Sequence, residues 1–164
     1  MLSKKMQKAL NDQVNAELYS AYLYLAMSNN FVAKNFPGMA NWMKVQAGEE
    51  LGHAMKIYGF IHERNGEAVL AQIDTPPAKW ASPLAVFQEA YKHEQLVTSK
   101  IHKLVESARL EKDYATEVFL NWFVSEQVEE EAAAVEIVEK LKLIGDHPGG
   151  LYMLDRELGA RAAH

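Results

Sequence analysis

The stretch EELGH, residues 49–53, lies in the middle of a segment that otherwise has the pattern of an amphipathic helix. Apolar residues recur around it at helical spacing, from Trp42 to Ile61. Glu50 and His53 are three residues apart, so they share the helix face that this pattern predicts to be buried. Because burying an unpaired charge costs several kcal/mol, the carboxylate and the imidazole predict partners elsewhere in the chain.

The segment around this stretch is the second of four long helices that the sequence predicts. The first helix is expected to begin after Ser3, a good N-cap, and to end before NFPG, where Pro37 and Gly38 break the pattern. The second helix is predicted from about Met39 to Asn65, and the glycine that follows is its stop signal.

Two further long helices and a short one are predicted in the second half of the chain. Ser82 and Pro83 combine an N-cap with a proline at the first helical position, which is a typical start of a helix. Asp113 can cap a fourth helix, which is expected to end at Gly145. The segment LYMLDRELGARA, residues 151–162, has the pattern of a short fifth helix.

A stretch with poor periodicity and a Pro-Pro pair, EAVLAQIDTPPAKWA (residues 67–81), joins the second and third helices. About sixteen extended residues reach ~50 Å, which is enough to run the length of the bundle. Such a crossover leaves helices two and three parallel, whereas the short connections make the other sequential pairs antiparallel. The predicted fold class is all-α, a four-helix bundle with a long crossover between helices two and three and a short fifth C-terminal helix. We expect residues 1–145 to form the bundle and residues 146–164 to pack on the same domain.

The composition is that of a mildly acidic globular protein. The 164 residues include 17 basic and 22 acidic side chains, and the formal net charge of −5 gives no reason to expect nucleic-acid binding. The absence of cysteine excludes disulfides and thiolate metal sites. The N-terminus lacks the apolar core of a signal peptide, and no stretch reaches the ~18 apolar residues of a membrane span. We therefore expect a cytoplasmic protein with no membrane partner.

Each of the four long helices interrupts its predicted buried face with an acid near the helix midpoint. The acids are Glu17, Glu50, Glu94 and Glu130, and two further polar residues, His53 and Gln127, lie on the same faces. Helix midpoints in an antiparallel-paired bundle fall in one layer, so these side chains should converge.

Four buried carboxylates cannot stay charged together without compensation, since like charges raise each other's pKa. No lysine or arginine falls in this layer of the predicted buried faces. Protons can neutralise the acids, but divalent or trivalent metals do so better, and carboxylates with one imidazole suit iron or manganese. Two metals that share a bridging carboxylate would satisfy four acids and one histidine, so the sequence predicts a di-metal site.

The chain resembles the non-haem ferritins of bacteria and archaea essentially from end to end. The resemblance rests on the motifs NAELYSAYLYL (15–25), EELGHAMK (49–56), YKHEQ (91–95) and FVSEQVEEE (123–131). It implies a ferritin-like bundle with a ferroxidase centre, in which Glu17, Glu50 and His53 hold one iron. The second iron would use Glu50 as a bridge, together with Glu94 and Glu130.

The resemblance also assigns residues around the two irons. Gln127 would lie beside the metal ligands or near bound oxygen, and Tyr24 could hydrogen-bond a ligand or donate an electron. A third iron site on the cavity side is implied, with the residues Glu49, Glu126, Glu129 and again Glu130. Taken without the resemblance, EQVEEE is an ordinary charge run, so a solvated acidic patch stays an alternative.

The sequence differs from related families at positions that distinguish them from the non-haem ferritins. Bacterioferritins and rubrerythrin-type bundles carry a second Glu-x-x-His motif on the fourth helix, where this chain has Gln127 and Glu130. Leu51 stands where a bacterioferritin would place its haem-ligating methionine, so no haem is expected. The absence of cysteine also removes the rubredoxin module of rubrerythrins.

The function that the resemblance implies is iron storage with ferroxidase activity. Dioxygen or hydrogen peroxide would oxidise Fe(II) at the di-iron centre, and ferric oxide mineral would be deposited inside a hollow shell of 24 subunits. Two alternatives stay open. One is a different di-metal oxidoreductase, a relative of rubrerythrin that would not store iron, and the other is a structural bundle whose acids are protonated.

Overall fold

The computed structural model describes residues 1–163 and contains, within them, five helices and no strand, as the sequence predicted. The helices are α1 (Lys4–Ala33), α2 (Pro37–Glu63), α3 (Pro83–Leu110), α4 (Tyr114–Ile144) and α5 (Pro148–Gly159). The last residue of the expected C-terminal segment, His164, lies outside the described residues. None of the helices combines the length and the apolar character that crossing a membrane requires.

Three of the helix starts are the predicted N-caps. The hydroxyl oxygen of Ser3 accepts a hydrogen bond from the backbone N–H of Met6, and that of Ser82 accepts one from Ala85. The Asp113 carboxylate accepts a hydrogen bond from the N–H of Thr116 at the start of α4. Each bond satisfies an N–H that has no partner inside the helix, which is why these residue types mark helix starts.

α1 ends before NFPG as predicted, but two helices start slightly earlier than predicted, and both start at a proline. Pro37 is the first residue of α2, which was expected from about Met39, and Pro148 is the first residue of α5, which was expected from residue 151. Proline is favoured there because its missing N–H would have no helical partner. The side chain of His147 caps α5 by accepting the N–H of Gly150, so this helix begins earlier than residue 151 and also ends earlier, at Gly159.

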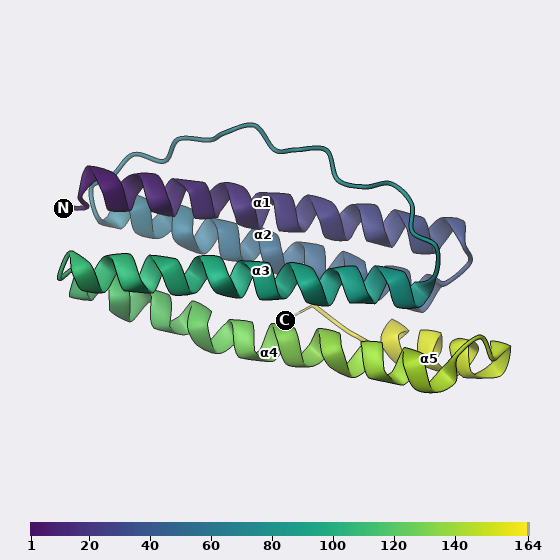
Figure 1. Ribbon diagram of the computed structural model, residues 1–164. Helices are drawn as coiled ribbons and strands as arrows, with labels where there is room; N and C mark the ends of the chain where they lie inside the picture. The colour runs from purple at the N-terminus through teal and green to yellow at the C-terminus, as the bar shows by residue number, and fades with distance from the viewer. Residues whose placement is uncertain (164) are drawn as a thin grey trace.

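The connections pair the helices as predicted. α1 and α2 run antiparallel, as do α3 and α4, while the crossover follows the outside of the bundle and leaves α2 and α3 parallel (Figure 1). Two asparagines of α1 anchor the crossover: Asn11 bonds the backbone of Glu67 and Val69, and Asn15 bonds that of Gln72. The crossover is therefore held against α1 by side chains that satisfy its backbone groups.

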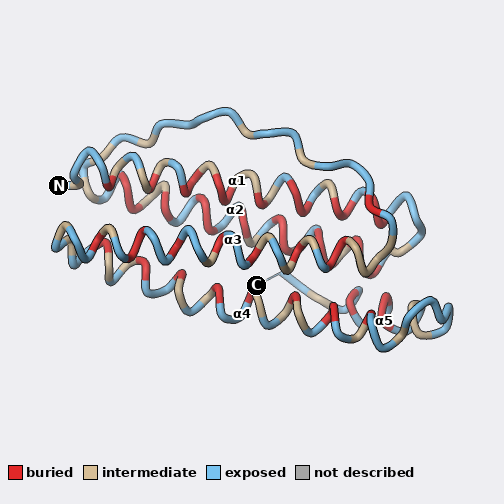
Figure 2. Tube along the Cα trace, in the orientation of Figure 1, coloured by how far each residue is buried: buried red, intermediate tan, exposed pale blue. Residues whose placement is uncertain are grey.

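The buried core is divided into two apolar clusters along the bundle axis. One cluster lies towards the α1–α2 turn and includes Phe31 and Phe87, and the other lies towards the opposite end and includes Leu10 and Phe123. Buried positions line the inward faces of the long helices (Figure 2). The predicted acids occupy the layer between the two clusters.

α5 docks on the first turn of α2 through a close backbone approach. The two carboxylate oxygens of Asp155 accept the N–H groups of Gly38 and Met39, which are otherwise unpaired at the α2 N-terminus. A Cβ atom on Gly38 would lie 1.6 Å from the backbone oxygen of Asp155, so only glycine fits there. This contact fixes where the chain leaves α5 and returns towards the polar layer.

Candidate metal centre

The four predicted acids meet in the middle of the bundle, one from each long helix. Their exposed fractions are 1% for Glu17, 2% for Glu50, 1% for Glu94 and 6% for Glu130. His53 and Gln127 are buried with them. The convergence predicted from the helix midpoints is therefore observed.

The acids and the histidine form two groups that share one residue. Ligand atoms of Glu17, Glu50 and His53 all lie within 4.8 Å of one another, and so do those of Glu50, Glu94 and Glu130. Such spacing suits a metal ion bound by each group. Glu50 belongs to both groups, so it is the residue through which two ions would be connected.

The described side chains do not satisfy every carboxylate oxygen of the layer. One oxygen of Glu17, Oε2, is buried and has no hydrogen-bond partner among residues 1–163, while the other accepts a bond of 2.8 Å from the Gln13 amide. A buried acceptor without a partner is costly, so it indicates a missing donor or cation. A metal ion held between Glu17, Glu50 and His53 would supply it.

The electrostatics of the layer point the same way. Burial and the neighbouring Glu50 raise the pKa of Glu17 well above its ordinary value, and burial with Glu94 and Glu130 does the same for the pKa of Glu50. Burial raises the pKa of Glu94, and burial together with Glu94 raises the pKa of Glu130 to about 8. Without a cation the layer therefore favours protonation of its acids, and a metal ion can take the place of protons there.

Two glutamines that the sequence reasoning missed orient the acids. Gln13 donates to Glu17, and the Nε2 of Gln46 donates to Glu50 Oε1 at 2.9 Å and to Glu130 Oε2 at 2.8 Å. Each bond holds one carboxylate oxygen and leaves the other for a metal. The signal was present, because each glutamine precedes an acid of the layer by four residues and therefore shares its helix face.

Tyr24 and Gln127 both contact Glu94. The Tyr24 hydroxyl donates a hydrogen bond to Glu94 Oε1, and the Gln127 amide donates to Oε2 at 3.1 Å. Burial and the Glu94 carboxylate raise the pKa of Tyr24 well above its ordinary value, so the phenol keeps its proton. The two donors therefore fix the orientation of the Glu94 carboxylate.

His93 had no role in the sequence analysis, but it packs against this part of the centre. Its Nε2 lies 2.7 Å from the Ser20 hydroxyl, and its ring meets the Tyr24 ring edge-on at 6.4 Å between centroids. Burial lowers the pKa of His93 to about 4, so the imidazole is neutral. It was missed because it lies off the predicted buried face of α3 and reaches α1 from the side.

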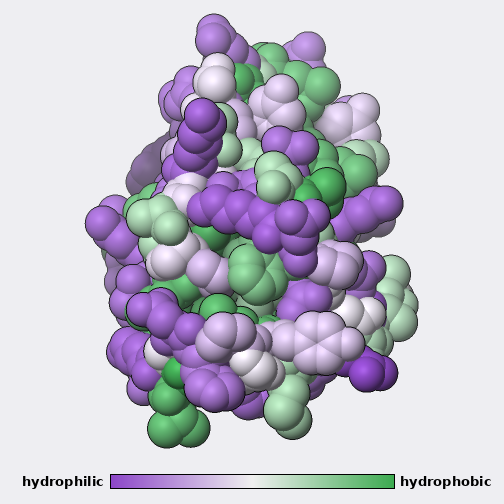
Figure 3. All heavy atoms as spheres, turned by 90° about the vertical axis from the view of Figure 1, so that its right-hand side faces the viewer, coloured by the Kyte–Doolittle hydropathy of each residue, from purple (hydrophilic) through white to green (hydrophobic). Residues whose placement is uncertain are grey.

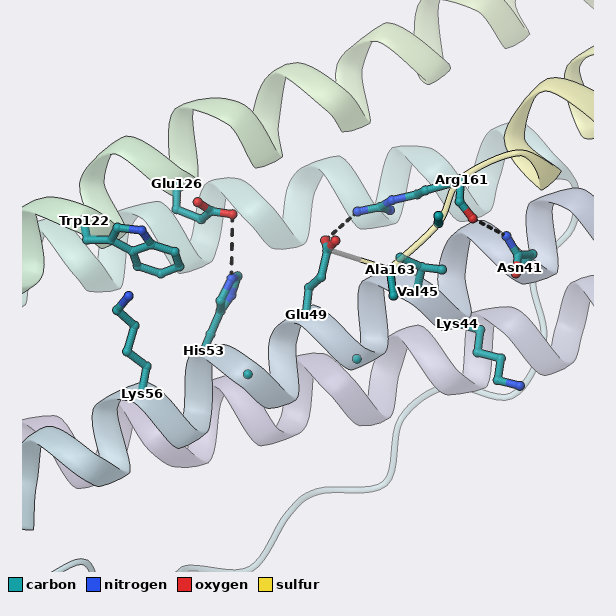
Figure 4. A pocket seen from close by; sticks show the side chains of 13 residues that line it. Asn41, Lys44, Val45, Glu49, His53, Lys56, Trp122, Glu126, Arg161 and Ala163 are labelled. Atoms are coloured by element: carbon teal, nitrogen blue, oxygen red, sulfur yellow. Dashed lines mark hydrogen bonds and ion pairs between the residues drawn. The ribbon is translucent and has the colours of Figure 1, made fainter.

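A pocket of about 820 Å³ lies beside the centre, between α2, α4 and the segment after α5 (Figure 4). His53 stands at its inner end: its Nδ1 lies 3.4 Å from Glu50 Oε2, whereas its Nε2 lies 3.8 Å from Glu126 Oε1. His53, Glu126 and Glu130 form a third group whose ligand atoms lie within 4.8 Å of one another. The imidazole therefore faces the buried groups with one nitrogen and the pocket with the other.

The structure does not bring all four residues of the implied third site together. Glu49 lines the pocket, but its carboxylate is paired with Arg161 at 2.5 Å, and Glu129 is exposed. Neither belongs to a group of metal-ligand spacing within residues 1–163. Arg161 was missed because nothing in the sequence pattern connects it with a residue more than a hundred positions away.

An all-α bundle with a buried carboxylate layer and a long crossover defines the class of ferritin-like carboxylate bundles. Residues 7–144 match the ferritin family, described as a ferritin-like domain. The chain is 46% identical to a bacterial non-heme ferritin of Bacteroides fragilis over 161 residues, 98% of this chain and 100% of the relative. It is 43% identical to the bacterial non-heme ferritin of Campylobacter jejuni, covering 95% and 93% of the two chains.

Comparison with solved structures also indicates the ferritin family. An engineered closed form of the Archaeoglobus fulgidus ferritin superposes with a TM-score of 0.99 at 53% identity, covering 100% of both chains. The open pore ferritin of the same archaeon superposes with a TM-score of 0.98 at 54% identity, over 99% of this chain and 100% of that one. The chain therefore belongs to the ferritin family, and its function is iron storage. The predicted resemblance and fold class are confirmed.

Proposed function

We propose that the protein is a ferroxidase that oxidises Fe(II) at the buried layer and stores the product as ferric oxide mineral inside a shell made of its own copies. The observation that carries the proposal is the sharing of Glu50 by two buried groups of metal-ligand spacing. The unpartnered oxygen of Glu17 in one of these groups supports it.

The proposed substrate is a pair of Fe(II) ions. Glu17, Glu50 and His53 bind one, and Glu50, Glu94 and Glu130 bind the other. Oxygen donors favour the harder Fe(III) over Fe(II). A ligand set of carboxylate oxygens with only one nitrogen therefore promotes loss of an electron from each ion. With dioxygen as oxidant, two Fe(II) give two electrons, and dioxygen with two protons becomes hydrogen peroxide. With hydrogen peroxide as oxidant, the same two electrons and two protons yield two molecules of water.

Tyr24 and Gln127 are proposed to support this step from the Glu94 side. Both donate hydrogen bonds to that carboxylate. A ligand whose orientation is fixed in advance keeps the distance between the two ions defined as their charge rises. The Tyr24 phenol also bonds a carboxylate of the layer directly, so electron donation from its ring is part of the proposal.

Oxidised iron is proposed to leave through the pocket that His53 faces. Glu126 lies on that side, and Glu49 lines the same pocket. Together with Glu129 and Glu130 they are the third iron position that the family resemblance implies. His53 has one ring nitrogen near Glu50 of the buried layer and the other near Glu126 of the pocket. An ion that moves from the layer to the pocket would therefore have ligand atoms along its way.

Assembly into a shell of 24 copies is proposed to provide the storage space. Apolar side chains remain exposed on a single chain, among them Leu143 of α4 and Tyr152 and Met153 of α5. Figure 3 shows the end of the molecule where α5 lies, with apolar side chains interspersed among polar ones. Leu143 and Met153 line one pocket with Ile144 and Leu154, and a grouped apolar surface of this kind is typical of contacts between subunits.

The catalytic part of the proposal is tested by a single-turnover oxidation with two Fe(II) per chain. Oxygen uptake and the absorbance of Fe(III) measure the rate of the reaction. Glu50→Gln should abolish rapid oxidation because it removes the shared ligand. Glu63→Gln, on the exposed face of the same helix, is the matched control and should oxidise iron at the wild-type rate. Equal rates for the Glu50 variant and the wild type would refute the assigned centre.

The storage part is tested by aerobic addition of Fe(II) in large excess over the centres, then size exclusion with iron detection. Soluble iron that elutes with a particle far larger than one chain is the expected result. Iron that stops at two or three ions per chain on a small oligomer would indicate a di-metal oxidoreductase instead. Absence of tight iron binding would indicate a structural bundle with protonated acids.

A further inference from the structure

The chain segment that follows α5 returns to the metal centre and places one positive charge at the pocket. The side chain of Arg161 spans the pocket wall between α5 and α2 (Figure 4). Its Nη2 lies 2.5 Å from Glu49 Oε2 and donates to Gln46 Oε1 at 2.8 Å. Its guanidinium carbon lies 4.3 Å from the centre of the Trp42 ring, and Asn41 holds its backbone oxygen at 2.9 Å.

These contacts link Arg161 to the buried layer through one glutamine. The Gln46 amide accepts from Arg161 with its oxygen and donates to Glu50 and Glu130 with its nitrogen. Arg161 thus fixes which end of the amide faces the two carboxylates. If Arg161 moves, the shared ligand Glu50 is affected through two hydrogen bonds, from Arg161 to Gln46 and from Gln46 to Glu50.

Arg161 also holds the Glu49 carboxylate, which the third iron position of the proposed function would use. Within residues 1–163, it is the residue ion-paired with Glu49, and both side chains are 20% exposed, so the pair is partly shielded from solvent. A positive charge a few ångströms from a metal position weakens cation binding there by Coulomb repulsion and by occupying the carboxylate. An iron ion that used Glu49 as a ligand would therefore compete with the arginine for it.

We propose that Arg161 is a displaceable counter-ion of the pocket, which leaves Glu49 when an iron ion arrives and returns when the ion moves on. The proposal rests on the function proposed above. In the resting protein Arg161 neutralises Glu49 and keeps Gln46 oriented towards the centre. Its competition keeps the third iron position weak, so iron passes through the pocket rather than staying there.

The geometry of the segment allows such a movement. Arg161 lies two residues beyond the end of α5 at Gly159 and outside any helix, so its side chain can leave Glu49 without unfolding a regular element. The stacking on Trp42 offers the guanidinium a second contact that does not involve Glu49. Lys56, which lines the same pocket, is engaged elsewhere, 3.7 Å from the centre of the Trp122 ring.

The test is an anaerobic titration of the metal-free protein with Co(II). Calorimetry and the visible absorbance of the bound ion measure each binding event. The wild type should show two tight binding events and a weaker third event. In Arg161→Gln the third event should tighten by about tenfold, because the competing charge is gone. Arg161→Lys keeps the charge and should bind the third ion nearly as the wild type does.

Arg156→Gln is the matched control, since it removes one exposed arginine of α5 that does not line this pocket. It should leave all three events unchanged. An unchanged third event in Arg161→Gln would overturn the inference, and so would an equal tightening in Arg161→Lys, because charge would then not be the cause. Absence of the two tight events in the wild type would instead refute the proposed centre itself, so the two failures are distinguishable.

A kinetic readout follows from the same competition. After a first addition of two Fe(II) per chain, the time needed before a second addition is oxidised at full rate reports how fast the pocket passes iron on. Arg161→Gln should lengthen this recovery, because an ion bound tightly in the pocket leaves it more slowly. A recovery time equal to that of the wild type would contradict the role of Arg161 in iron passage.

Discussion

Raising the pH should destabilise the metal-free protein, and Glu130 is the residue on which the size of this effect can be worked out. Its pKa rises from an ordinary 4.5 to about 8 in the folded chain. The folded state therefore keeps a proton that the unfolded chain releases above about pH 4.5. Stability from this group is complete below that pH and is lost as the pH rises through 8.

The magnitude follows from the pKa difference. At 1.36 kcal/mol per pKa unit, the loss for Glu130 is at most about 5 kcal/mol between pH 4.5 and pH 8. The other three acids also have raised pKa values, but they interact, so their effects do not add independently. A loss of this size is comparable with the whole stability of a typical domain. Metal binding should reverse it, because the ion stabilises the ionised carboxylates.

The assay is urea unfolding of the chelator-treated protein from about pH 5 to pH 8, at one protein concentration, with and without Zn(II). Glu130→Gln cannot ionise, so its stability should fall less over this range than that of the wild type. Glu129→Gln changes the exposed neighbour and should follow the wild type. The neutral, buried His93 titrates with the opposite sign below about pH 6.5, but equally in all three proteins. Identical pH dependence of Glu130→Gln and the wild type would refute the reasoning.

Four further changes have expected outcomes. His53→Ala should slow single-turnover Fe(II) oxidation by about tenfold or more, because one iron loses its nitrogen ligand, and a wild-type rate would contradict that assignment. Gly38→Ala should lower the melting temperature and the stability by about 1–3 kcal/mol or more, since its Cβ would meet the Asp155 backbone at 1.6 Å. Phe87→Ala should cost about 3–5 kcal/mol in urea unfolding, because the ring is fully buried. Ser82→Ala should cost about 1 kcal/mol through loss of the α3 cap, whereas an unchanged stability would show that the cap is dispensable.

Much of the fold could be predicted because it depends on local chemistry. The caps Ser3, Ser82 and Asp113 act on N–H groups three residues away, and the buried faces repeat with the helix period. The acids of the layer could be predicted for the same reason, since each interrupts such a face near its middle. The starts at Pro37 and Pro148 were predicted slightly too late because proline both ends and begins helices, and only the backbone that follows decides which.

The rest of the site depends on contacts that have no period in the sequence. Arg161 reaches Glu49 because α5 docks on the first turn of α2, and that docking rests on a carboxylate and a glycine far apart in the chain. His93 lies beside Tyr24 because α1 and α3 are neighbours across the bundle. Helical periodicity identifies the face that a residue shares, but it does not identify the partner that approaches from a different helix.

The long crossover has a consequence for the order in which the protein is assembled. It separates the chain into two helical hairpins, α1–α2 and α3–α4, each joined by a short turn and rich in local contacts, which favours rapid formation. The centre takes Glu17, Glu50 and His53 from the first hairpin and Glu94 and Glu130 from the second. An ion bound there therefore has ligands from both hairpins and stabilises their association. We therefore expect the hairpins to form first and the metal to select, among their possible alignments, the one in which the two sets of ligands meet.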